Sequence, residues 1–393
     1  MKEPAGENNA KVSVGLDSLT VFLKKEYLEG YIPFGGSKMK FVTGRQGSGK
    51  THLAACVRQE AEGLGYKTVS FSARDIWLHD FREIYLEILR QCDMEHVLQG
   101  CADRISLELG YDPAKISEGQ NLMDYLSELG EADPLIRGEI RSLLREKFVR
   151  NPRLDHNFGY ACSLIVGGML GHPMLEEANR DLLLAFLQGD KKVKLAQLRS
   201  LGLSPSRVTR YNARNLLRSL SELIHLAGYA GLLVSIDDME ILLNRTAGEM
   251  KRYTKLRRED AYESIRQLID DIDNMRYILF LFCFDRDLID NENYGVKSYQ
   301  ALWLRIQNEV VSPRFNCFAD IIDMDRYGDE FYSENILAEM AENFRSMLSA
   351  QGCESRRLSA EEIRGLYERA QFGGLGLPGL LYRAVSGKEE NHG

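Results

Sequence analysis

Apolar residues follow two patterns along the chain. Near-continuous apolar runs, typical of strands that are covered on both faces, occur at 231–237 (GLLVSID) and 276–285 (RYILFLFCFD), with shorter candidates at 38–42, 67–72 and 317–324. Between residues 80 and 226 the apolar positions instead recur at helical spacing. Strands that alternate with helices predict an α/β fold with a parallel sheet, and the long helical stretch is most simply an insertion into it.

A glycine-rich segment follows the first expected strand. Residues 44–51 fit the phosphate-binding pattern G-x-x-x-x-G-K-[ST] in full. In such a loop, backbone N–H groups surround phosphate oxygens, the lysine reaches the β- and γ-phosphates, and the hydroxyl binds Mg²⁺. We therefore predict ATP and Mg²⁺ here. The candidate nucleotide-binding residues are Gly44, Arg45, Gln46, Gly47, Ser48, Gly49, Lys50, Thr51 and His52, the last more simply a residue of the next helix.

Two carboxylates end the apolar run at 231–237. A strand end beside the phosphate loop is where ATPases hold Mg²⁺ and the attacking water. We assign Asp237 to the metal, with Thr51, and Asp238 to the water, while Glu240 is a further candidate. An ordinary strand that ends in solvated acids would look the same in isolation, but the phosphate loop favours the catalytic interpretation.

Asp285 ends the apolar run at 276–285. In ATPases with an additional strand between the two nucleotide-binding strands, a polar residue at this place senses the γ-phosphate. A carboxylate is unusual there, and Arg286 or Asp287 can serve instead. An acid that only caps the strand is an equally good interpretation.

Three arginines are candidates for action on the nucleotide from outside the loop. Arg305 and Arg314 precede the fifth expected strand, where an arginine can complete the site of a neighbouring subunit. Arg383 lies in the last helical segment and can read the nucleotide state. For each of them a surface arginine is the alternative.

Composition and charge limit the classes of partner. The chain is 44% hydrophobic and has 50 Lys and Arg against 58 Asp and Glu, a net charge of −8, which argues against coating nucleic acid by bulk charge. Two basic clusters remain, at 137–153 and at 251–258, the second with Tyr253. Cations beside an aromatic ring suit a DNA backbone, whereas a solvated helix face balanced by nearby acids is the alternative.

Apolar runs and cysteine spacing indicate the cellular compartment. No apolar run reaches the ~18 residues of a membrane helix, so no membrane partner is expected. Seven scattered cysteines without a CxxC pair are typical of reduced thiols. We expect a cytoplasmic protein.

Three stretches resemble a known family. They read IPFGGSKMKFVTGRQGSGKTHL, NLLRSLSELIHLAGYAGLLVSIDDMEIL and YILFLFCFDRDLIDNENYGVKSYQALWLRI, and they are similar to ATP-binding proteins of BREX-type phage-defence systems and to the ATPase of the Shango system. The resemblance implies an AAA-like ATPase that works in a defence operon with a helicase-type partner. The chain departs from the family pattern at Asp238, where Glu is expected, and at 376–383 (GLPGLLYR), which lacks the first arginine of the usual lid motif.

These observations predict an α/β P-loop NTPase with a parallel five-stranded AAA-like core, a large helical insertion and a C-terminal helical lid. The expected segments are 1–79 (N-terminal helix and first part of the core), 80–212 (helical insertion), 213–327 (second part of the core) and 328–393 (lid). We expect an ATPase that oligomerises and loads or controls a DNA helicase in anti-phage defence. The alternatives are a nucleotide-switched signalling ATPase and a nucleotide-binding scaffold with slow hydrolysis, which the shorter Asp238 favours.

Overall fold

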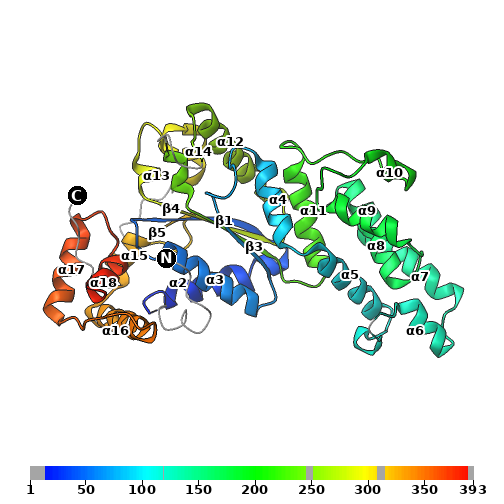
Figure 1. Ribbon diagram of the computed structural model, residues 1–393, viewed down its shortest axis with the longest axis horizontal. Helices are drawn as coiled ribbons and strands as arrows, with labels where there is room; N and C mark the ends of the chain where they lie inside the picture. The colour runs from blue at the N-terminus through cyan, green and yellow to red at the C-terminus, as the bar shows by residue number, and fades with distance from the viewer. Residues whose placement is uncertain (1–13, 118, 245–250, 308–314, 388–393) are drawn as a thin grey trace.

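A parallel five-stranded sheet forms the centre of the molecule (Figure 1). The computed structural model describes residues 14–117, 119–244, 251–307 and 315–387. The strand order is β2-β3-β4-β1-β5. The strands are β1 Ser37–Gly44, β2 Lys67–Ser72, β3 Leu232–Asp237, β4 Ile278–Asp285 and β5 Ile321–Asp323. The α/β class and the five parallel strands predicted from the sequence are confirmed.

The pairing of the strands brings their carboxyl ends to one edge. Gly44 at the end of β1 lies opposite Asp285 at the end of β4. Asp237 at the end of β3 lies opposite Ser72 at the end of β2. Because β4 separates β1 from β3, the phosphate loop and the acids after β3 flank the end of β4.

Two strands are shorter than their apolar runs. The strand expected at 317–324 is reduced to β5, because the carbonyl groups before it turn to a buried lysine. Lys40 Nζ donates to the carbonyl oxygens of Phe318 at 2.9 Å and Ala319 at 2.8 Å. The strand expected from 276 begins two residues later, because Tyr277 has a φ of +57°, outside the extended region.

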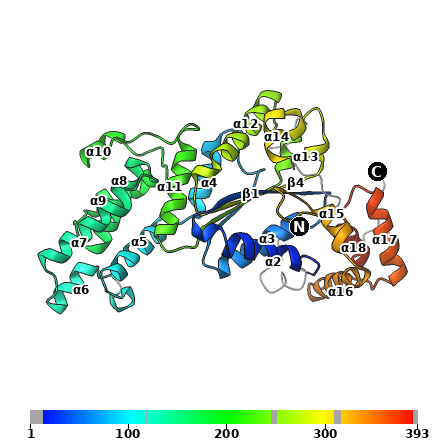
Figure 2. The same ribbon diagram turned by 180° about the vertical axis from the view of Figure 1, so that it is seen from behind.

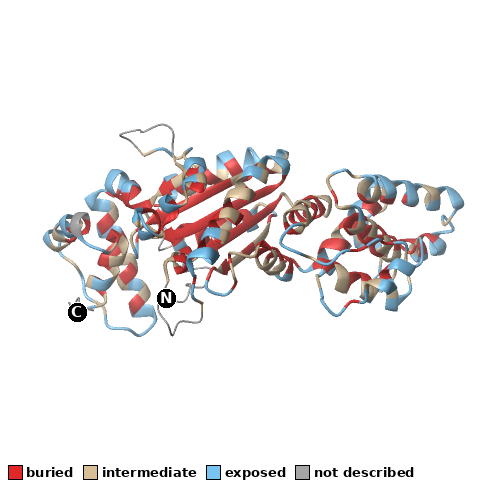
Figure 3. Cartoon of the chain, turned by 90° about the horizontal axis from the view of Figure 1, so that it is seen from above, coloured by how far each residue is buried: buried red, intermediate tan, exposed pale blue. Residues whose placement is uncertain are grey.

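Helices cover both faces of the sheet, and buried residues gather on the strands and on the helix faces toward them (Figure 3). One face packs against α3 Lys50–Gly63, α2 Asp17–Leu23, the π-helix η1 Lys24–Glu29 and the C-terminal helices. The other face packs against α4 Phe81–Gln91, α11 Ala213–Leu226, α12 Lys255–Asp271 and α14 Gln300–Ile306. A short helix, α13 Asp287–Asp290, follows β4.

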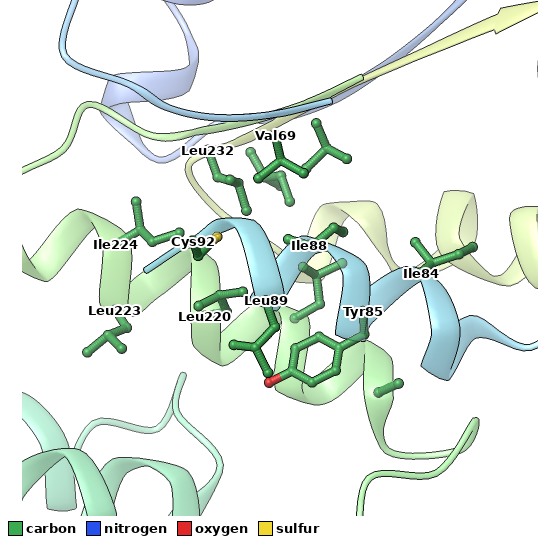
Figure 4. Packing of buried hydrophobic residues seen from close by; sticks show 14 of the residues in the cluster. Val69, Ile84, Tyr85, Ile88, Leu89, Cys92, Leu220, Leu223, Ile224 and Leu232 are labelled. Atoms are coloured by element: carbon green, nitrogen blue, oxygen red, sulfur yellow. The ribbon is translucent and has the colours of Figure 1, made fainter. Parts of the chain in front are cut away.

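A block of helices stands between β2 and β3 in the chain and extends to one end of the molecule (Figures 1 and 2). Its α-helices are α4 Phe81–Gln91, α5 Met94–Glu108, α6 Leu122–Leu129, α7 Pro134–Leu144, α8 His156–Leu170, α9 Glu177–Leu187, α10 Leu195–Ser200 and α11 Ala213–Leu226. Within the block, Ile88 of α4 and Ile224 of α11 belong to the same buried cluster as the sheet residues Val69 and Leu232 (Figure 4). The hydrophobic core therefore runs without interruption from the sheet into the block.

Four helices follow β5 and form the opposite end of the molecule (Figures 1 and 2). They are α15 Met324–Phe331, α16 Glu334–Ala350, α17 Ala360–Phe372 and α18 Leu377–Val385. A capping box of Ser359 and Glu362 starts α17. The expected boundary between 327 and 328 falls inside α15, whereas Asp80 and Asn212 directly precede α4 and α11.

All seven cysteines are free thiols, and five of them are buried. Within the described ranges, every helix is too short or too polar to serve as a bilayer-spanning segment.

Candidate active site

The phosphate loop connects β1 to α3 in a conformation that requires glycine. Gly47 and Gly49 have φ values of +75° and +97°, in the left-handed region. A Cβ atom at Gly47 would lie 2.9 Å from the Cα of Gly379 in α18. Ser48 is 1% exposed, and its hydroxyl has no hydrogen-bond partner within the described part of the chain. The loop thus offers a buried polar group and backbone amides, as a phosphate site requires.

Lys50, at the first position of α3, is turned into the loop. Its ammonium donates to the carbonyl oxygens of Gly44 at 3.0 Å and Arg45 at 2.9 Å, and to Asp285 Oδ1 at 2.7 Å. The side chain is only 8% exposed. The structure therefore brings Asp285, predicted as a γ-phosphate sensor, into direct contact with the predicted phosphate-binding lysine.

Thr51 and Asp237 lie in contact at the edge where the carboxyl ends of the strands lie. Thr51 Oγ1 donates to Asp237 Oδ2 at 2.5 Å, although 186 positions separate the two residues. Burial is the largest influence on Asp237 and raises the pKa of its carboxyl group, while the hydrogen bond from Thr51 acts in the opposite direction. A hydroxyl and a carboxylate are the hard oxygen ligands that Mg²⁺ takes together with substrate phosphates. The two residues therefore fit a magnesium site.

Asp238 and Glu240 contact the end of β2 and the loop that follows it. Ser72 Oγ donates to Asp238 Oδ2 at 2.6 Å, and Arg74 pairs with both acids. Glu240 Oε2 also accepts from the backbone N–H of Asp285 at 3.3 Å, and burial raises the pKa of Glu240. Sequence reasoning missed Ser72 and Arg74. The end of β2 was a usable signal, because the carboxyl ends of parallel strands share one edge.

Ion pairs and hydrogen bonds connect the phosphate loop to β5, to α15 and to the end of α17. Asp325, 6% exposed, accepts from the backbone N–H of Arg45 at 2.9 Å and pairs with the guanidinium groups of Arg45 and Arg286. Arg286 also pairs with Asp323, and its backbone N–H donates to Gly44 O at 3.0 Å. Arg45 Nη1 donates to Gly373 O at 3.1 Å. Arg45 and Arg286, both candidates for contact with nucleotide, therefore have structural partners.

The start of α18 lies directly on the phosphate loop. The backbone N–H groups of Gly376 and Gly379 donate to the carbonyl oxygens of Gln46 and Gly47, each at 2.8 Å. Arg383 is exposed, one helical turn beyond Gly379. The backbone of the GLPG segment therefore lies against the loop.

Two other predicted residues have partners outside the loop. Arg305 binds Asp270 of α12 through Nε at 2.5 Å and Nη2 at 3.2 Å. His52 lies in α3, where its Nε2 is 3.6 Å from Cys56 Sγ. Arg314 lies outside the described residues.

The basic cluster at 251–258 differs from the surface that its sequence suggested. Tyr253 is 1% exposed and Arg258 is 4% exposed. The Tyr253 hydroxyl accepts from the backbone N–H of Leu78 at 3.0 Å. Tyr253 therefore belongs to the core, and of the five cations in this cluster Arg258 is buried with it.

Comparison with known proteins adds the family. The model of the BREX system ATP-binding protein BrxC/D matches residues 8–376. The chain belongs to this family. The predicted resemblance to BREX-type ATP-binding proteins is confirmed, and the match covers the phosphate loop and the strand ends described above. A search of curated proteins found no match.

Proposed function

We propose that the chain hydrolyses ATP with Mg²⁺ at the edge where β1, β3 and β4 end. The observation that carries this proposal is the 2.5 Å contact between Thr51 Oγ1 and Asp237 Oδ2. The contact joins a complete phosphate-loop motif to an acid at the end of a distant strand, which is the pair of ligands that ATPases of this class provide. Membership of an ATP-binding family supports the same substrate.

Each residue then has a defined part. Lys50 and the loop N–H groups bind phosphate oxygens, and Lys50 leaves the carbonyl groups of the loop to do so. Thr51 and Asp237 hold Mg²⁺, which neutralises charge on the phosphates when it is bound. Asp238 orients the attacking water once its carboxylate leaves Ser72. Arg305 reaches the site of a neighbouring subunit only after it leaves Asp270.

The wider architecture supports an AAA-like interpretation. Strand β4 lies between the strand of the phosphate loop and the strand of the paired acids, as in ATPases with an additional strand. Helices α15 to α18 then form the lid, since α18 begins on the phosphate loop. We propose that such subunits assemble in a nucleotide-dependent manner and control a helicase-type partner on DNA during phage defence.

A scaffold with slow hydrolysis is the second candidate. The observation that favours it is the engagement of Asp238 by Ser72 and Arg74, which leaves this short carboxylate turned toward β2.

Lys50→Ala tests the main proposal. We expect turnover of ATP to fall about a hundredfold or more, because the charge that meets the phosphates is removed. Lys147→Ala, which removes a lysine paired with Glu108 in the helical block, is the control and should keep wild-type turnover. Equal phosphate release by wild type and Lys50→Ala would show that this loop is not the site of hydrolysis.

A further inference from the structure

A basic segment, which includes α10, joins α9 to α11 in the helical block (Figure 1). Residues 190–214 contain seven lysines and arginines and a single acid, Asp190, in a chain whose net charge is −8. The Asp190 carboxylate is engaged within its own turn, where it accepts from the backbone N–H of Lys192 at 2.8 Å. The segment therefore carries a positive charge that its own acid does not balance.

Arg207 holds the two ends of this segment together. Its Nη1 donates to the backbone carbonyl oxygen of Lys191 at 2.7 Å, and its Nη2 donates to that of Val193 at 3.5 Å. Val193 is buried in the core, whereas the side chains on either side of it, Lys192 and Lys194, are exposed together with Lys191. These hydrogen bonds place three accessible ammonium groups beside the loop that leads into α11.

The same loop presents an aromatic ring to solvent. Tyr211 is 77% exposed. Arg210 Nη2 donates to the Tyr211 hydroxyl oxygen at 2.8 Å, and the guanidinium lies 4.9 Å from the ring centroid. The Asn212 side chain fixes the turn, because it donates to the carbonyl oxygen of Arg207 at 3.0 Å and accepts from the backbone N–H of Thr209 at 2.7 Å. A fixed turn therefore holds a large aromatic surface open to solvent.

We propose that a single strand of nucleic acid binds the helical block here, with its phosphates on the lysines and a base stacked on Tyr211. We call Lys191, Lys192, Lys194, Arg210 and Tyr211 the Tyr211 surface. Proteins that bind single strands combine cations that follow the backbone with exposed rings on which unpaired bases stack. The inference goes beyond the proposed hydrolysis of ATP, because binding at this surface does not need the phosphate loop.

The chemistry of the Tyr211 surface favours nucleic acid over an acidic protein segment. Protein interfaces bury a core of apolar side chains within a polar rim. Between residues 189 and 214, all of which the structure describes, Tyr211 is the one exposed large apolar or aromatic side chain. A protein partner would find no apolar core here. A strand of nucleic acid supplies a charge at each phosphate and a flat base for the ring.

Fluorescence anisotropy with a labelled oligonucleotide of thirty thymidines, measured without ATP, tests the charge contacts. The variant combines Lys191→Ala, Lys192→Ala and Lys194→Ala and leaves Arg207, which holds the segment together, in place. On single strands the slope of log Kobs against log salt concentration loses about 0.7 for each phosphate contact removed, so we expect it to become less steep by about 2. A slope equal to that of the wild type overturns the assignment of phosphates to these lysines.

Three arginines of α7 provide the matched control. Arg137, Arg141 and Arg145 are exposed in the same helical block, and their replacement by alanine changes the net charge by the same amount. This variant should keep the wild-type affinity and salt dependence. A loss as large as that of the lysine variant would show that the charge of the whole block attracts the strand, which overturns the Tyr211 surface as its site.

Tyr211→Ala separates stacking from charge. We expect the affinity for the oligonucleotide to fall about tenfold, the contribution of one stacked base, with the salt dependence unchanged. Tyr211→Phe keeps the ring and should bind as the wild type does. Equal binding by Tyr211→Ala and the wild type overturns the stacking contact.

Two further outcomes separate the proposals from each other. Tighter binding of polyglutamate than of the oligonucleotide, with the same loss in the lysine variant, overturns the nucleic-acid assignment in favour of an acidic protein segment. Binding of the oligonucleotide that depends on Tyr211 and the lysines, in a protein that releases no phosphate from ATP, supports this inference and overturns only the proposed hydrolysis.

Discussion

Asp285 places a negative charge beside Lys50, the lysine that we propose binds the phosphates of ATP. The 2.7 Å contact between Asp285 Oδ1 and Lys50 Nζ must be given up when the lysine meets phosphate. Asp285→Asn keeps the shape and removes the charge, so we expect ATP to bind about tenfold more tightly. Titration with a fluorescent ATP analogue measures the change. Asp273→Asn, at an exposed acid that follows α12, should bind as wild type. Weaker binding by Asp285→Asn would mean that the carboxylate helps to hold the nucleotide.

Asp237 combines its proposed place in the magnesium site with a cost to the stability of the fold. Because burial raises its folded-state pKa, the folded protein takes up the proton more readily than the unfolded chain. This carboxyl group therefore stabilises the fold below the ordinary aspartate pKa, and that contribution is lost as the pH rises through the raised value. At pH 7.5 we expect Asp237→Asn to unfold at a higher temperature than wild type without Mg²⁺, while turnover falls about a hundredfold.

Unfolding temperatures measured over a range of pH test the prediction for Asp237. The difference in unfolding temperature between Asp237→Asn and wild type should shrink as the pH falls toward the ordinary aspartate pKa. Asp181→Asn, at an exposed acid of α9, should show no such trend. A wild type that is more stable than Asp237→Asn at pH 7.5 would contradict the sign derived from burial.

At the scale of residues, the sequence predicted a contact correctly where one motif requires a particular residue type in a second motif. The phosphate-loop pattern requires an acid near Thr51, and Asp237 was the best candidate at an apolar strand end; the two now lie in contact. Ser72 and Arg74 were missed because their contact with Asp238 depends on which strand is the neighbour of β3. Strand order is a property of the whole sheet. The sequence indicated that the end of β2 shares an edge with Asp238, but not that β2 is the neighbour of β3.

Helix α18 begins so close to the phosphate loop that its first turn requires glycine. A Cβ atom at Gly376 would lie 2.5 Å from the Cα of Ser48 and 2.6 Å from its backbone nitrogen. Gly376→Ala should push the helix away from the loop, because overpacking of backbone against backbone costs about 1–3 kcal/mol. We expect KM for ATP to rise about tenfold, measured in steady-state assays.

Gly365 of α17 offers the matched control for this change. A Cβ atom there meets nothing within 4 Å, and alanine is favoured over glycine inside a helix by about 1 kcal/mol. Gly365→Ala should therefore keep the wild-type KM and unfold at a slightly higher temperature. If Gly376→Ala also keeps the wild-type KM, the contact between α18 and the loop has no part in nucleotide binding.

A strand could be predicted from the sequence where the residues within it determine its structure. Near-continuous apolar runs marked β3 and β4, because both faces of these strands are covered. The run at 317–324 failed to give a full strand because Lys40, nearly three hundred positions earlier, takes the carbonyl groups of Phe318 and Ala319. A buried ammonium with carbonyl partners competes with strand pairing, and the sequence around β5 gives no sign of it.

At the scale of the molecule, the helical block and the sheet share one core. Ile88 of α4 is 0% exposed and packs among residues of the sheet and of α11 (Figure 4). Ile88→Ala should cost about 2–5 kcal/mol, because the cavity forms where the two parts meet. We expect the midpoint of the helical circular-dichroism signal and the midpoint of nucleotide-analogue binding to fall together during thermal unfolding.

A block that folded on its own would respond differently, and Leu198 provides the comparison. Leu198 is equally buried and belongs to α10, a helix at the end of the block away from the sheet (Figure 1). Leu198→Ala should lower the midpoint of the helical signal and shift the midpoint of nucleotide binding by a smaller amount. If Ile88→Ala lowers only the helical midpoint, the shared core does not couple the block to the site. If it lowers both, a partner that binds the block acts on the same folding unit that holds ATP.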